Sequence, residues 1–173
     1  STTVTIPTQG ATSPTSYPNM SLFWADEFTG SELSDNYWSH ETGNGSNGWG
    51  NNELQYYRSG ESNLIVADGK ASIIAKQENF GSAEYTSARI QTKGKYDVQY
   101  GRIEARIKVP MGQGIWPAFW MLGSNISEVH WPLCGEIDVL EYVGKEPGEI
   151  FTSLHTKASH GNTINTKKAK FPA

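Results

Sequence analysis

The stretch GEIDVLEYV, residues 135–143, places three carboxylates on a segment that is otherwise built mostly of apolar residues. Successive side chains of a β-strand point to opposite faces, so Glu136 and Asp138 share a face while Glu141 points away. One extra residue, a β-bulge, would reverse the alternation and bring all three acids to one face. Val139-Leu140 is the one adjacent apolar pair between the acids, so we expect the bulge there.

With the bulge, Glu136 and Glu141 behave like residues four apart on a strand, with backbones roughly 13 Å apart at about 3.3 Å per residue. Leaning toward each other over Asp138, their carboxyl groups would come to about 5–5.5 Å, the separation found in retaining glycosidases. One glutamate would attack an anomeric carbon, and the other would protonate the leaving oxygen and later activate water. Like charges at short range raise at least one pKa, which keeps an acid protonated near neutral pH.

Two other interpretations of these three carboxylates stay open on spacing alone. The run is also compatible with the solvated acidic face of an edge strand. A calcium site is the third interpretation, although carbonyl or amide oxygens from a loop would be expected there, and this run has none of that character.

The elements that must position these acids are predicted to be short strands, because helical periodicity is nearly absent and turn signals recur. Residues 63–76 form two apolar runs joined at Asp68-Gly69, a strong hairpin signal. Past Lys157 the chain is polar, and we expect no further strand there. Antiparallel sheets packed face to face are the predicted architecture. The other predicted strands are 101–110, ended by Pro110, two within 85–101 around Lys93-Gly94, and 115–122, 135–143 and 149–157. The cluster Lys167, Lys168 and Lys170 is predicted to be a solvated loop.

Composition restricts the classes of function. The 173 residues suit one domain with a real core, and no apolar run is long enough to span a membrane. Net charge is −4 with scattered Lys and Arg, which argues against nucleic acid or an anionic membrane as partner. Cys134 is the one cysteine, so no internal disulfide is possible. Aromatic residues make up 12% of the chain, and several tryptophans near Gly, Asn and Pro suit either a core or a sugar-stacking surface.

Four blocks together resemble glycoside hydrolase family 16: GEIDVLEYVG, LFWADEFTG (22–30), WGNNELQYY (49–57) and GIWPAFWML (114–122). The resemblance runs from about Leu22 to about His155. The bulged form E-x-D-x-x-E is most similar to the laminarinases, which are endo-acting 1,3-β-glucanases. It implies an all-β fold, a β-jelly-roll sandwich of two antiparallel sheets, and hydrolysis of β-1,3-glucan with retention of configuration. Agar- and carrageenan-cleaving members share the bulged form and are one alternative, and a β-glucan-binding fragment without turnover is another.

Carried over by position, the resemblance implies that Glu136 is the nucleophile and that Glu141 is the acid/base and carries the raised pKa of the pair. Asp138 would hold the nucleophile in place. His155 is expected on the neighbouring strand near the acid/base, although a lone histidine is more often part of a core, and Arg89 could simply pair with a carboxylate. The expected substrate-binding residues are Asn52, Arg89, Trp116, Trp120, Trp131 and His155.

The resemblance also implies no cofactor in the chemistry and a structural calcium, held in part by Glu27 and the backbone oxygen of Gly69. Family domains usually continue for several strands after the position of His155. We therefore expect residues 1–20 to be a Ser/Thr/Pro-rich tail or linker and residues 21–173 a catalytic domain truncated on its C-terminal side, with a second chain as one source of the missing strands. A polymeric substrate predicts a secreted or cell-surface protein.

Overall fold

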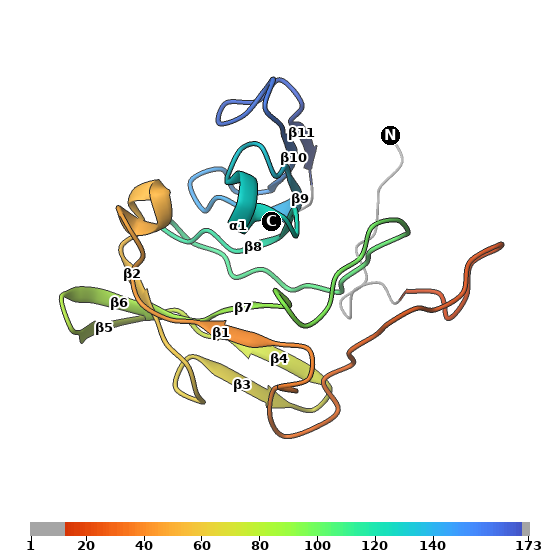
Figure 1. Cartoon of the computed structure of the whole chain (residues 1–173). Coiled ribbons are helices and arrows are strands. Elements are labelled where there is room, and N and C mark those ends of the chain that lie inside the picture. The colour runs from red at the N-terminus through yellow and green to blue at the C-terminus, as the bar shows by residue number, and fades with distance from the viewer. Residues whose placement is uncertain (1–12, 171–173) are drawn as a thin grey trace, which may run out of the picture. The chain divides into compact units, whose positions relative to one another are not determined.

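The computed structural model describes residues 13–170, and these residues divide into two compact units. One unit comprises residues 16–100, and the other comprises residues 101–170 with residues 13–15. In both units almost all of the regular secondary structure is short β-strands, as predicted (Figure 1). No described helix has the length and apolar character that crossing a membrane requires. The predicted tail at 1–20 falls largely on residues outside the described range.

The unit of residues 16–100 contains three small sheets. Strand β1 pairs antiparallel with β7, β2 runs parallel to β6, β6 pairs antiparallel with β5, and β3 forms a hairpin with β4. A five-residue helical turn, η1, precedes β2. The elements are β1 Ser39–Glu41, η1 Gly48–Asn52, β2 Gln55–Tyr57, β3 Leu64–Ala67, β4 Lys70–Ile73, β5 Lys76–Phe80, β6 Ala83–Ser87 and β7 Arg89–Gln91.

The β3–β4 hairpin confirms the prediction made from Asp68-Gly69. Both turn residues have positive φ, 51° and 69°, as a two-residue turn matched to the twist of the strands requires. Leu64 and Val66 are buried while Ile65 between them is exposed, so this strand has one core face.

A buried polar group ties this hairpin to its neighbouring sheet. Asn63 is fully buried, and its Nδ2 donates to the Ile74 carbonyl and to Thr86 Oγ1, both at 2.9 Å. Thr86 in turn donates to Glu78 Oε1 at 2.6 Å. Since buried polar groups are costly when unpaired, this chain of bonds specifies how β3, β5 and β6 pack.

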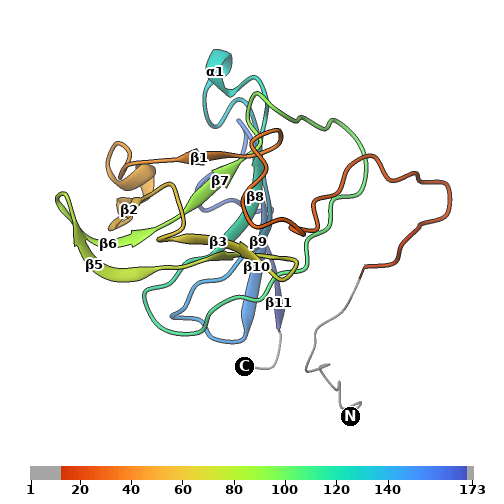
Figure 2. The ribbon, with the colours of Figure 1, turned by 90° about the horizontal axis from the view of Figure 1, so that it is seen from below.

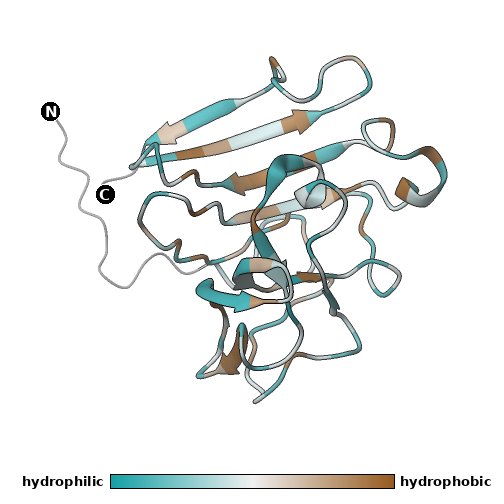
Figure 3. Cartoon of the chain, turned by 90° about the vertical axis from the view of Figure 1, so that its left-hand side faces the viewer, coloured by the Kyte–Doolittle hydropathy of each residue, from teal (hydrophilic) through white to brown (hydrophobic). Residues whose placement is uncertain are grey.

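The second unit holds one four-stranded antiparallel sheet in the order β11-β10-β9-β8, which Figure 2 shows nearly edge-on. A single helical turn, α1, lies between β8 and β9 in sequence. Ile137 and Leu154, paired across β9 and β10, are each 46% exposed on the face opposite the acids. The elements are β8 Ala118–Leu122, α1 Ile126–Val129, β9 Glu136–Glu141, β10 Glu149–His155 and β11 Lys167–Lys170. Hydrophilic and hydrophobic residues alternate along many of the strands (Figure 3).

Two strand predictions are wrong. Residues 101–110, and the second strand expected in 95–101, form no ladder with another described strand, and residues 101–108 are exposed throughout. The alternation Ile103, Ala105, Ile107 specifies a face, but a strand also needs a hydrogen-bonded neighbour, which no local pattern supplies.

The loop predicted after Lys157 is also wrong, because β11 pairs with β10 over residues 167–170. Lys168 Nζ lies 2.9 Å from Glu146 Oε2 and from Glu149 Oε2, and 4.5 Å from the centre of the Phe151 ring. The lysine-rich composition that suggested a loop is typical of an edge strand, where charge discourages further pairing.

Replacing Asn63 by alanine should lower the free energy of unfolding by about 1–3 kcal/mol, because Thr86 Oγ1 and the Ile74 carbonyl lose a buried partner. Urea denaturation followed by tryptophan fluorescence measures this loss. Ser72→Ala, at an exposed position of β4, is the control and should change stability by less than about 0.5 kcal/mol. Equal effects of the two substitutions would contradict the assigned role of Asn63.

Candidate active site

A β-bulge lies in β9 at the predicted place. Along β8, Phe119 pairs with Leu140 and the next residue, Trp120, pairs with Asp138, so Val139 has no partner. Along β10 the register shifts over the same stretch, between Phe151 and Ser153. Both neighbours of β9 therefore accommodate one extra residue at Val139-Leu140, and the predicted bulge is confirmed.

The bulge brings the three acids to one face of the sheet. Alternate residues of β8, namely Ala118, Trp120 and Leu122, pair with the three acids in turn, and alternate residues of a strand share a face. Phe151, Ser153 and His155 do the same on β10. The acids thus form one row between two flanking strands, as predicted.

Asp138 lies at the centre of this row and is 4% exposed. Burial, followed by the charges of Glu136 and Glu141 and a hydrogen bond with Glu136, raises the pKa of Asp138 to about 8. Asp138 is therefore protonated at neutral pH and can donate its proton in the hydrogen bond with Glu136.

His155 lies on the neighbouring strand, as predicted, but its register partner is Glu136, and the residue opposite the expected acid/base Glu141 is Phe151. Its Nε2 lies 3.0 Å from Asp138 Oδ2, although the two groups are not aligned as a hydrogen bond. The imidazole is 13% exposed. The imidazole therefore covers Asp138 on the side that faces β10.

Glu141 is half-buried and accepts a hydrogen bond from a tryptophan. Trp116 Nε1 donates to Glu141 Oε1 at 3.0 Å. The pKa of Glu141 is raised, chiefly by burial and also by the charge of Glu136, while the Trp116 hydrogen bond and the charge of His155 oppose the rise. The direction is the one predicted for a residue that must keep a proton.

The three predicted tryptophans are all in this unit. Trp116 and Trp131 are 47% and 43% exposed, while Trp120 is partly buried beside Asp138 on the acid face. The Trp131 ring lies 6.1 Å from His155 and 5.2 Å from His160, centre to centre. Two wide aromatic faces thus remain open to a ligand in the same unit as the acids.

Arg89 and Asn52 belong to the other unit. Arg89 Nε lies 2.6 Å from Glu41 Oε2, so the expected alternative, an ion pair with a carboxylate, is realised. Its guanidinium also lies over the rings of Trp49 and Tyr57, at 4.8 and 6.0 Å. Asn52 is exposed at the end of η1. Arg89 thus contacts Trp49 and Tyr57, the first and last residues of the WGNNELQYY block.

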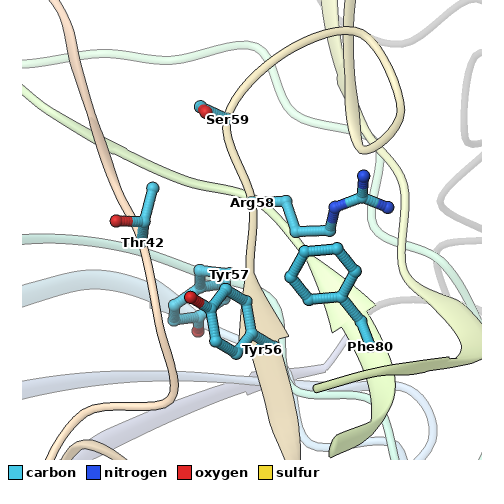
Figure 4. A pocket seen from close by; sticks show the side chains of 6 residues that line it. All are labelled: Thr42, Tyr56, Tyr57, Arg58, Ser59 and Phe80. Carbon is cyan, nitrogen blue, oxygen red and sulfur yellow. The ribbon is translucent and has the colours of Figure 1, made fainter.

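A cavity of about 240 Å³ in the unit of residues 16–100 was not predicted from the sequence. The Arg58 guanidinium lies 4.2 Å above the Phe80 ring, whose centre is 4.9 Å from that of Tyr56. In the sequence, the one indication of this cavity is the adjacent aromatic pair Tyr56 and Tyr57. Figure 4 shows its lining: Thr42, Tyr56, Tyr57, Arg58, Ser59 and Phe80.

The described residues include one candidate metal site near the acids. Among them, one group of three suitable side chains lies within 4.8 Å: Glu136, Asp138 and His155. A metal there would require a deprotonated Asp138, against its raised pKa. At the predicted calcium site, the backbone oxygen of Glu27 lies 3.6 Å from where a Cβ on Gly69 would stand. The two expected ligand residues are therefore neighbours, as two residues of one calcium coordination shell must be. The calcium itself stays a prediction.

Two glutamates flanking a protonated aspartate on one bulged strand define a glycoside hydrolase type of site. The chain belongs to glycoside hydrolase family 16: the model of the XgeA-like catalytic GH16 domain matches residues 46–171. It is 42% identical over 155 residues to a beta-glucanase of Rhodothermus marinus, covering 87% of this chain and 53% of that protein. The glucan endo-1,3-beta-glucosidase of Cryptopygus antarcticus is also 42% identical, over 159 residues, covering 87% and 57%.

Solved structures agree with this assignment. A laminarinase of a Flavobacterium species is 58% identical with a TM-score of 0.81, covering 87% of this chain and 64% of that chain. The laminarinase catalytic domain of Thermotoga maritima is 41% identical with a TM-score of 0.83, covering 88% and 63%. The predicted all-β jelly-roll sandwich is confirmed by this likeness. The chain spans less than two thirds of the length of each of these four relatives.

Asp138→Asn should stabilise the protein more at pH 8 than at pH 5. The native aspartate holds its proton up to about pH 8, whereas the unfolded residue loses it near 3.9. The native state therefore binds more protons across this window, and stability falls as pH rises through it. Asparagine does not titrate, so the substitution removes this dependence of stability on pH. The Tm difference between the variant and wild type should therefore be at least about 2 °C larger at pH 8 than at pH 5.

Thermal melts of wild type and variant at pH 5 and pH 8 measure this difference. Asp68→Asn, at the exposed turn of the β3–β4 hairpin, is the matched control and should show no such growth. A Tm difference for Asp138→Asn that is the same at both pH values would show that Asp138 titrates normally.

Proposed function

We propose that this chain is the catalytic part of an endo-acting β-1,3-glucanase that hydrolyses laminarin-type glucan with retention of configuration. The observation that carries the proposal is the bulge at Val139-Leu140, which puts Glu136 and Glu141 on one face on either side of a protonated Asp138. The relatives named as 1,3-β-glucanases and laminarinases support the choice of substrate.

In the first step, a Glu136 carboxylate oxygen attacks the anomeric carbon and forms a covalent glycosyl ester. The bond from that carbon to the leaving oxygen breaks, and this oxygen takes the proton of Glu141. In the second step, Glu141, now a carboxylate, removes a proton from water, and the water oxygen replaces Glu136 at the anomeric carbon. Two inversions give net retention. The mechanism requires about 5–5.5 Å between the two carboxyl groups.

Asp138 serves both steps as a proton-bearing neighbour. A hydrogen bond from its carboxylic acid orients Glu136, and the protonated Asp138 adds no negative charge to the row. His155, 3.0 Å from Asp138 Oδ2, limits the positions open to that side chain.

The glucan would lie on aromatic faces. Pyranose rings stack on planar side chains through their apolar faces, and Trp116 and Trp131 are the exposed tryptophans of this unit. Trp120, beside Asp138, would contact the sugar at the reaction centre. Asn52 and Arg89 are proposed to hydrogen-bond sugar hydroxyls.

Two further features are part of the proposal. A structural calcium, held in part by Glu27 and the Gly69 carbonyl, would stabilise the fold and supply no chemistry. A polymeric substrate outside the cell makes secretion or cell-surface display the expected location.

Proton NMR of laminarin incubated with this chain tests the function. We expect the β-anomer to appear first, no product from Glu136→Gln, and unchanged product from Glu128→Gln, an exposed glutamate on α1. Initial α-anomer would contradict the retaining mechanism. Binding of laminarin without turnover in wild type would replace the hydrolase with a glucan-binding function.

Glu141→Gln should lower kcat/KM by about 10²–10⁴-fold, the usual contribution of a general acid. The basic limb of the pH–rate profile should also vanish, because no proton is left to lose at this position. The profile of kcat/KM between pH 4 and pH 9 measures both effects. A slowed variant that keeps the wild-type basic limb would assign the acid to another residue.

A further inference from the structure

We infer that Trp116 is a positioning residue for the acid/base: its indole N–H occupies Oε1 of Glu141 and so leaves the catalytic proton on Oε2. The inference rests on the proposed function, because it assigns the proton donor to Glu141. It differs from a sugar-stacking role, which would use the face of the ring and not its Nε1. The hydrogen bond of 3.0 Å is the observation that carries it.

The backbone holds Trp116 in place for this bond. Gly144 N donates to the Ile115 carbonyl at 2.9 Å, and Tyr142 N donates to the Pro117 carbonyl at 3.0 Å. These bonds continue the β8–β9 ladder beyond the strand ends, so Trp116 is fixed from both sides. It lies two residues before Ala118, the partner of Glu141, which makes it a diagonal neighbour on the acid face, within reach of a long side chain.

Gly144 shows how tightly this segment is packed. A Cβ at Gly144 would stand 1.7 Å from the Gly112 carbonyl oxygen and 3.0 Å from the Ile115 side chain. Because glycine has no Cβ, Gly144 allows the turn at 111–114 to pack this close to the end of β9. A cavity of about 180 Å³ lies beside the tryptophan, lined by Gly114, Ile115, Trp116, Val143, Gly144 and Lys145.

The hydrogen-bond chemistry decides which oxygen carries the proton. An indole N–H is a donor only, so the oxygen it contacts must accept. In a protonated carboxyl the hydroxyl oxygen carries the proton and the carbonyl oxygen is the stronger acceptor, so the Trp116 N–H favours Oε1 as the carbonyl oxygen. The proton then lies on Oε2, and it passes from there to the leaving oxygen as the glycosidic bond breaks.

The same bond restrains the ionisation of Glu141. The titratable groups facing Glu141 are Glu136 and Asp138 on β9 and His155 on β10, while β8 contributes Ala118 and Trp120, which do not titrate. Burial and Glu136 favour the neutral acid, whereas Trp116 and His155 favour the carboxylate that the second step needs. Trp116 thus opposes an excessive rise of the Glu141 pKa.

Trp116→Phe tests this role, because it keeps an aromatic ring and removes the donor. Trp131→Phe, which alters a similarly exposed tryptophan of the same unit, is the matched control. The readout is the ¹³C NMR titration of the Glu141 carboxyl, assigned by its absence in Glu141→Gln. We expect Trp116→Phe to favour the protonated acid by about three- to tenfold, moving the titration up by roughly 0.5–1 pH unit.

The basic limb of the laminarin kcat/KM profile should move upward with it, and Trp131→Phe should move neither. A Glu141 titration in Trp116→Phe equal to that of wild type, or an equal shift in Trp131→Phe, would overturn the inference. The NMR titration needs no turnover, so an inactive wild type would refute the proposed function and leave this inference to its own test.

A second measurement covers the case in which Trp116→Phe does not fold. In ¹⁵N-labelled wild type, one indole N–H signal should move with the titration of Glu141, and that movement should be absent in Glu141→Gln. An unaltered pH response of every indole signal in Glu141→Gln would overturn the inference without any change at Trp116.

Discussion

The unpaired Val139 in β9 is the constraint on which the site depends. Without it, Glu141 would point to the same face as Ile137 and Leu154 and could not act with Glu136 on one substrate. Because β8 and β10 both shift register across the same stretch, the bulge is held by hydrogen-bonded ladders on two sides. A bulge held in this way re-aims the side chain that follows it, here Glu141.

The three carboxylates crowd together on that face, and the two glutamates there have different surroundings. The central Asp138 is nearly inaccessible to solvent and keeps its proton, so the row carries less negative charge than its composition suggests. Glu136 receives a hydrogen bond from that proton, whereas Glu141 receives one from an indole. Identical side chains thus have different environments, with a carboxylic acid as the donor to Glu136 and the Trp116 indole as the donor to Glu141.

The sequence predicted the features that local chemistry determines. The bulge followed from the spacing of Glu136 and Glu141 around one apolar pair, and the hairpin at Asp68-Gly69 followed from turn chemistry. The wrong predictions depended on distant partners: residues 101–110 alternate correctly without joining a described strand, and β11 forms from a lysine-rich run because β10 is beside it. The pairings of Arg58 with Phe80 and of Trp116 with Glu141 are likewise contacts across the fold, which no spacing along the chain reveals.

We propose that the bulge makes Glu136 and Glu141 a retaining pair, with Glu136 as the nucleophile. A 2-deoxy-2-fluoro β-1,3-linked glucosyl fluoride tests it most directly, because its glycosyl ester forms and then breaks down slowly enough for peptide mass spectrometry. We expect one added sugar on Glu136. A label on Glu141, or turnover of the reagent with no covalent adduct, would contradict it.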